Sequence, residues 1–174
     1  MNYFEFYNIP VSFQVDEAAL RRIFYQNSKK FHPDFHTLSD AGQQAEMLEM
    51  ATLNNEAYQT LLDPDKRMRY ILKINGLLED EGKLPIPQDF LMEMMEINEG
   101  LMELELDFDD ARYKTTLEAV DTLENTLYQD IQPTLEAYTP ESGTRAGLEA
   151  VQEYFLKKRY LLRIRENLSK FAAH

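Results

Sequence analysis

Residues 17–34 read EAALRRIFYQNSKKFHPD, and this stretch decides how the N-terminal part of the chain folds. Asp16, directly before it, is a typical N-cap residue, and the apolar residues that follow recur at helical spacing. The residue before a proline is disfavoured in the α conformation, so the helix is expected to end at His32. The sequence therefore predicts a helix over residues 17–32, about four turns long, followed by a sharp corner at Pro33.

The two sides of this predicted helix differ in chemistry. At roughly 100° per residue, mainly apolar side chains gather on one side and polar, partly cationic ones on the other. The first side holds Leu20, Ile23, Phe24, Asn27 and Phe31, and the second holds Arg22, Tyr25, Gln26 and Lys29. The first side is expected to pack inward and the second to face water.

The tripeptide His32-Pro33-Asp34 is a candidate site beside that polar side. Proline has a fixed φ and no N–H, so it ends the helix and displays the imidazole and the carboxylate on a rigid loop. A carboxylate held in this way suits a bidentate contact with an arginine of a partner that offers an acidic groove to the cations. The alternative is an ordinary helix stop and turn. A metal site of His32, Asp34 and His36 is not expected, because Pro33 spoils the helical ligand geometry.

The rest of the chain also carries helical patterns. Six glycines and seven prolines are few for 174 residues, and period-2 runs rich in Val, Ile or Thr are almost absent. An all-α fold is predicted, with further helices over residues 42–62, 64–74, 89–107, 110–138 and 144–171. Two Gly and two Pro mark residues 76–88 as a linker. We therefore expect domains at 1–75 and 89–174, the second an antiparallel three-helix bundle.

Composition excludes several classes of function. The chain has 18 basic and 31 acidic residues, a net charge of −13, and no Cys. Without cysteine there is no zinc ribbon, no thiol nucleophile and no thiolate-bound cluster, and the negative charge disfavours nucleic acid and anionic membranes. No apolar run approaches the ~20 residues of a membrane span. We expect a cytoplasmic protein with no cofactor, no metal and no catalytic centre.

The acidity is concentrated around the predicted helix 89–107. Residues 79–110 carry 12 acids and one Lys. One seam suffices for a bundle core, at Phe90, Met94, Ile97, Leu101, Leu104 and Phe108. Met92 and Met95 fall roughly opposite that seam, on the side of the glutamates, with Leu91 and Met102 along the flank. Thioethers among carboxylates suit a basic, partly apolar partner; the alternative is that the first domain covers this face.

Three short stretches of the N-terminal half resemble the J domain of DnaJ-type co-chaperones. They are Lys29–Asp34, Asn55–Leu61 and Pro64–Arg67. The resemblance implies short helices around an antiparallel helical hairpin. It also implies that the tripeptide and a face formed by Arg22, Tyr25, Gln26, Lys29 and Lys30 dock on a DnaK-type chaperone and stimulate its ATPase. Two departures are Phe35, where relatives often have Lys, and Asn54, at a position that is usually apolar.

Residues outside the J domain are similar to the HscB family, the J-proteins of iron–sulfur cluster assembly. The similar stretches are Tyr70–Gly76, Phe90–Glu99 and Lys157–Leu161. This resemblance implies an L-shaped protein whose C-terminal bundle binds an IscU-type scaffold and whose J domain meets a DnaK/HscA-type chaperone. The scaffold contacts that it implies are Leu91, Met92, Met95, Glu96, Glu99, Glu103, Arg159 and Tyr160.

The sequence thus predicts a co-chaperone that makes and breaks no bonds itself. Two alternatives stay open: a J-protein that delivers a different client, and a passive helical adaptor. The sequence leaves the oligomeric state open between a monomer and a weak dimer.

Overall fold

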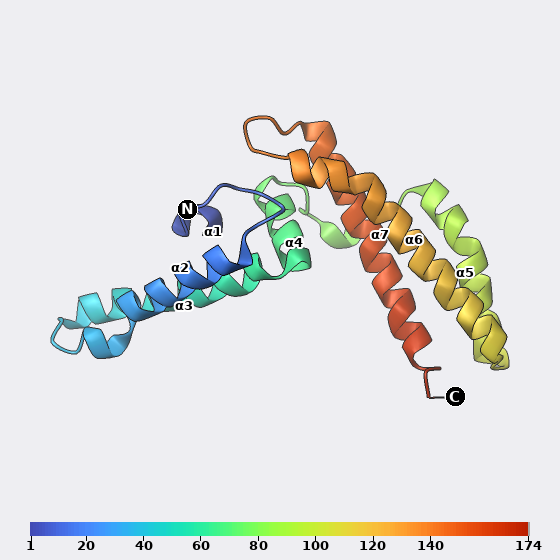
Figure 1. Cartoon of the computed structure of the whole chain (residues 1–174), viewed down its shortest axis with the longest axis horizontal. Coiled ribbons are helices and arrows are strands. Elements are labelled where there is room, and N and C mark those ends of the chain that lie inside the picture. The colour runs from blue at the N-terminus through green and yellow to red at the C-terminus, as the bar shows by residue number, and fades with distance from the viewer. Residues whose placement is uncertain (174) are drawn as a thin grey trace. The chain divides into compact units, whose positions relative to one another are not determined.

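The computed structural model describes residues 1–173 and is all-α, as predicted. Within these residues it has seven α-helices, two short 3₁₀-helices and no strand (Figure 1). The chain divides into two compact units. The first unit comprises Met1–Gly76 and Tyr138–Gly143, and the second comprises Leu77–Ala137 and the chain from Thr144 onward. None of the helices in residues 1–173 is long and apolar enough to cross a bilayer.

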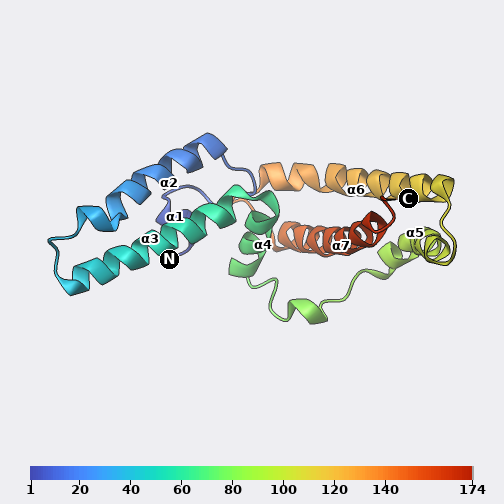
Figure 2. The ribbon, with the colours of Figure 1, turned by 90° about the horizontal axis from the view of Figure 1, so that it is seen from below.

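The first unit is built around a helical hairpin. Helices α2 and α3 lie side by side and run in opposite directions (Figures 1 and 2). The elements of this unit are α1 (Tyr3–Phe6), α2 (Glu17–Phe31), η1 (Pro33–Phe35), α3 (Ala41–Leu62) and α4 (Pro64–Ile74). Aspartates cap the three longer helices: Asp16 and Asp63 each accept two backbone N–H groups of the first turn, and Asp40 accepts one. Helix α2 ends one residue earlier than expected, because His32 before the proline is already extended, with ψ 132°.

An arginine lies inside this unit. The Arg67 side chain is buried; its Nε donates to the Phe13 carbonyl at 2.9 Å and its Nη1 to the Leu61 carbonyl at 2.6 Å. Burial lowers the pKa of the guanidinium. These bonds tie the segment before α2 to the end of α3, so Arg67 joins parts of the chain far apart in sequence.

Asn54 supplies a second buried polar centre. It is 1% exposed, its Nδ2 donates to the Phe24 carbonyl and to Ser28 Oγ at 3.2 Å each, and its Oδ1 accepts from the Tyr7 hydroxyl at 2.9 Å. Burial raises the pKa of Tyr7. Asn54 therefore joins α3 to α2 and to the residue that follows α1, and its polar atoms are satisfied although the J-domain resemblance implies an apolar residue there.

The second unit is a three-helix bundle. Its helices are α5 (Gln88–Leu106), α6 (Asp110–Ala137) and α7 (Arg145–Ser169), so the predicted bounds are correct to within two residues. Short connections make successive helices antiparallel (Figure 1). The core is formed by Phe90, Met94, Ile97, Leu101, Leu104, Val120, Leu161, Ile164 and Leu168. The predicted seam of α5 is therefore buried, except that Phe108, just past the helix, is only partly buried.

The segment between α4 and α5 is attached to α7 at its beginning. Leu77 and Leu78 are buried, and Gln152 Nε2 of α7 donates to the Leu77 carbonyl at 2.6 Å. A short 3₁₀-helix, η2 (Glu81–Lys83), follows. These residues belong to the second compact unit.

Replacing Asn54 by alanine is expected to destabilise the first unit by about 2–3 kcal/mol. The Tyr7 hydroxyl would keep only its longer bond to the backbone carbonyl of residue 54, and the Phe24 carbonyl and the Ser28 hydroxyl would lose the amide as a donor. Leaving buried polar groups underpaired costs more than the bonds themselves contribute. Urea denaturation followed by circular dichroism measures the change. Asn55→Ala is the matched control, because Asn55 is the next residue of the same helix and is exposed. Equal stabilities of the two variants would contradict the role given to Asn54.

Candidate protein-interaction sites

The His-Pro-Asp corner is a hydrogen-bonded 3₁₀ turn. His32 Nδ1 accepts the Asp34 backbone N–H at 3.1 Å, which requires that this ring nitrogen carry no proton. The Phe35 N–H donates to the His32 carbonyl at 3.1 Å and the His36 N–H to the Pro33 carbonyl at 3.0 Å. The Asp34 side chain is 84% exposed. The turn therefore holds the carboxylate in water on a fixed backbone.

Two side chains outside the tripeptide fasten this loop, and sequence reasoning missed both. His36 Nε2 lies 2.8 Å from the Lys30 carbonyl at the end of α2. Gln44 Nε2, on the first turn of α3, lies within hydrogen-bond distance of three loop carbonyls, those of His36 and Thr37 at 3.3 Å and Ser39 at 3.0 Å. A glutamine in a helical pattern carries no sign of such a role, because its partners are fixed only once the hairpin has formed.

The predicted cationic face lies beside the corner. Arg22, Tyr25, Gln26, Lys29 and Lys30 are all exposed, and all belong to α2. Phe35 is exposed as well, with its ring edge-on to His32 at 6.1 Å between centroids. The five side chains are thus exposed on one helix, and the tripeptide directly follows the end of that helix.

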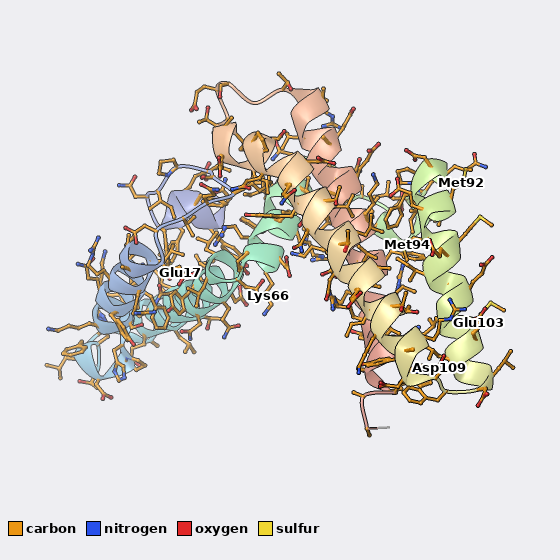
Figure 3. The ribbon with its side chains drawn as sticks, turned by 45° about the vertical axis from the view of Figure 1, so that its right-hand side comes forward. Glu17, Lys66, Met92, Met94, Glu103 and Asp109 are labelled. Carbon is orange, nitrogen blue, oxygen red and sulfur yellow. The ribbon has the colours of Figure 1, made fainter. Side chains whose placement is uncertain are left out.

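Helix α5 presents the predicted methionine and glutamate face to solvent. Met92 is 67% and Met95 58% exposed, whereas Met94 is fully buried. Figure 3 shows Met94 directed toward the other helices of the bundle and Met92 directed away from them. The carboxylates of this face, Glu96, Glu99 and Glu103, are exposed, and so is Leu91. The exposure of these methionines agrees with the prediction that they lie outside the bundle core.

Three further residues predicted to contact the scaffold have different partners in the structure. Glu103 pairs with Arg112 Nη2 of α6 at 2.6 Å. Arg159 forms an ion pair with Glu81 of η2, and its guanidinium lies over the Phe155 ring. Its neighbour Tyr160 lies on the α5 side of α7.

Tyr160 contacts α5 twice. Its hydroxyl accepts from Asn98 Nδ2 at 3.1 Å, and its ring stands edge-on to Phe90 at 5.7 Å between centroids. Tyr160 therefore adjoins the face of α5, whereas Arg159 is engaged with the segment before α5.

A glycine lets α5 approach α6 closely. A Cβ added at Gly100 would lie 2.5 Å from Thr116 Oγ1, well inside van der Waals contact. Gly100 and Thr116 are both buried. This close approach constrains the rotation of α5 about its axis, and the rotation determines which residues of that helix face outward.

Comparisons with known proteins agree with this architecture. A family model described as the HSCB C-terminal oligomerisation domain matches residues 86–169. A curated HscB homologue of Neisseria meningitidis is 29% identical over 168 residues, 96% of each chain. The homologue of Vibrio cholerae is 36% identical over 102 residues, which cover 58% of this chain and 60% of that one.

Solved structures match over nearly the whole chain. Chaperone HscB from Vibrio cholerae has a TM-score of 0.68 at 24% identity, covering 99% of this chain and 98% of that one. Human co-chaperone protein HscB has a TM-score of 0.73 at 28% identity, covering 99% and 82%. The relatives and the solved structures that this chain matches belong to one class of protein, the co-chaperones. The matches to named relatives narrow the class: this chain is similar to HscB co-chaperones over nearly its whole length, and residues 86–169 match the HscB family model.

Replacing Gly100 by alanine is expected to destabilise the bundle by about 1–2 kcal/mol, although alanine is the better helix former, because the added methyl overlaps Thr116. In a Thr116→Ala background the same change should be neutral or stabilising. Thermal denaturation of the four proteins of this double-mutant cycle measures the coupling. A stabilising effect of Gly100→Ala in the parent chain would show that α5 and α6 have room to spare.

Proposed function

We propose that this protein binds an IscU-type iron–sulfur scaffold and delivers it to a DnaK/HscA-type chaperone, whose ATPase it stimulates. In this proposal residues 1–75 act as the J domain, 76–88 as the linker and 89–174 as the scaffold-binding bundle. The observation that carries it is that one chain, similar to HscB co-chaperones, exposes two surfaces of different chemistry on two compact units. One is cationic with a fixed carboxylate, and the other is apolar and anionic.

The chaperone contact is assigned to the His-Pro-Asp corner and the face of α2. A carboxylate on a rigid turn loses little conformational entropy on binding, and it can take both N–H groups of a partner arginine. The cations of α2 beside it complement an acidic groove and raise the rate of encounter. His32 contributes through its bond to the Asp34 N–H, which orients the turn.

The scaffold contact is assigned to the outer face of α5 with Tyr160. Flexible thioethers adapt to an irregular apolar surface, and the surrounding carboxylates select a partner with basic side chains. Because Tyr160 is tied to Asn98, its ring is held beside the α5 face without a further loss of rotamer freedom on binding. Arg159 would have to leave Glu81 to contact a partner directly, so its part in this surface is indirect.

Coupling between the partners follows from their attachment to one chain. A scaffold bound to the bundle meets the chaperone at an effective concentration that the connection sets, in the millimolar range for short connections. ATP hydrolysis takes place on the chaperone. The protein contributes binding and orientation only.

Asp34→Asn is expected to abolish stimulation of the chaperone ATPase while the fold stays intact. The amide keeps the shape of the side chain and its backbone N–H to His32, but it loses the charge, and breaking a buried charged contact costs about 2–5 kcal/mol. A steady-state ATPase assay with the purified chaperone measures the effect. Asp130→Asn, an exposed position on α6, is the control. Undiminished stimulation by Asp34→Asn would refute the assigned contact and favour a passive adaptor.

Met92→Ala combined with Met95→Ala is expected to weaken binding of the scaffold by about 2 kcal/mol, within the range of interface anchors. Both side chains are exposed, so the melting temperature should stay unchanged. Titration calorimetry with a purified scaffold measures the affinity, with Leu162→Ala as the control, because Leu162 is exposed on α7 roughly 200° from Tyr160. Normal binding by the double variant would mean that another client, or none, uses this face.

A further inference from the structure

The exposed apolar surface of α5 extends beyond the residues that the sequence singled out. Leu91, Met95, Met102 and Leu106 are all exposed, the last two by 63% and 87%. At roughly 100° per residue these four fall within about 60° of one another, so they form one line along the helix. We call this line the α5 stripe. It covers fifteen residue steps, about 22 Å.

The bundle core does not use the stripe. The buried residues of α5 lie on the other side of the helix, where Met94, Ile97 and Leu104 pack against α6 and α7. Met102 and Leu106 continue a surface that begins at the N-terminal end of the helix, and they are exposed to solvent about two and three turns beyond Met95. Isolated exposed apolar side chains are common, but four in line on one helix are typical of an interaction surface.

Carboxylates border the stripe on the side of α6. Glu99 and Glu103 fall next to it on the helix, and the bond from Glu103 to Arg112 of α6 identifies that side. Because Arg112 compensates part of the charge of Glu103, Glu99 contributes most of the negative charge of this border. Glu99 is exposed, and residues 79–110 hold 12 acids against one Lys. An apolar line with a carboxylate border complements an apolar segment that carries basic residues along one edge.

We propose that the α5 stripe is the seat of one elongated segment of the scaffold, apolar along its centre and basic along the edge that meets α6, and that Met102 and Leu106 hold its far half. This inference rests on the proposed scaffold partner. A stripe of about 22 Å matches a helix of about fifteen residues or a strand of about seven.

A second copy of this chain is a poorer occupant. Residues 75–174 carry 10 basic and 21 acidic side chains, so two bundles repel each other. Helix α7 of a neighbour does carry an excess of cations, six against three acids, but two of its arginines are already paired within the unit, Arg159 with Glu81 and Arg165 with Asp121 and Glu124. Charge therefore favours a basic partner over self-association.

The test measures binding to the purified scaffold by titration calorimetry for the parent chain and two double variants. One is Met102→Ala with Leu106→Ala, and the other is Met92→Ala with Met95→Ala. Met102→Ala with Leu106→Ala should weaken binding at least about fivefold, because two anchors of the far half are lost. The melting temperature should not change, since both side chains are exposed. Leu162→Ala, an exposed leucine on α7, is the matched control and should bind as the parent does.

Each other outcome decides the matter. If Met92→Ala with Met95→Ala weakens binding and the Met102/Leu106 variant binds within about twofold of the parent, the contact ends at Met95; the stripe proposal is then overturned while scaffold binding stands. If neither variant changes the affinity, both the proposed function and the stripe fail. If Met102→Ala with Leu106→Ala instead lowers the molecular mass that analytical ultracentrifugation gives for the protein without scaffold, the stripe forms contacts between copies of this chain and the proposal is overturned.

Discussion

A helix at the surface of a small unit buries only part of its circumference against its neighbours, and this constraint governs both candidate surfaces. Helix α2 uses Leu20 and Phe31 for the core of its unit, which leaves the side with Arg22 and Lys29 in water. Helix α5 likewise fills the bundle core from one side. Whatever the sequence places on the remaining side is free to meet a partner, so the chemistry of that side carries the functional information.

Presenting a side chain to a partner also requires that the backbone under it be fixed. Pro33 ends α2 abruptly, but a proline alone leaves the following loop free to move. The loop is fastened by bonds that cross it, from the His36 ring to the Lys30 carbonyl and from Gln44 to the carbonyls of residues 36–39. On α5 the close approach at Gly100 has the same effect, because it sets the rotation of the helix and hence the direction of Met92. In both places, residues that touch no partner decide the geometry of those that are proposed to do so.

The sequence predicted what local physics determines. Helix bounds followed from Asp16, Asp63 and the prolines, and the buried seam of α5 from its spacing. It could not predict contacts between residues distant in sequence, since no periodicity signals them. Asn54 bonds to Phe24, 30 residues earlier in the chain, and so becomes a structural residue of its unit. Arg159 pairs with Glu81, 78 residues earlier, and this pair holds a proposed scaffold contact away from the α5 face. Leu106 was missed for another reason. A leucine in a helical pattern is usually interpreted as a core residue, and only the structure shows that this one is exposed.

The distribution of charge completes the argument for two separate partners. Residues 1–74 carry 8 basic and 10 acidic side chains, close to balance, whereas residues 75–174 carry 10 and 21. The face of α2 can therefore keep a local positive potential that a uniformly acidic chain would cancel. In the proposed function this separation also prevents exchange of the partners, because an acidic chaperone groove is repelled by α5 and a basic scaffold segment by α2. Specificity would then arise as much from the repulsion of the wrong surface as from attraction to the right one.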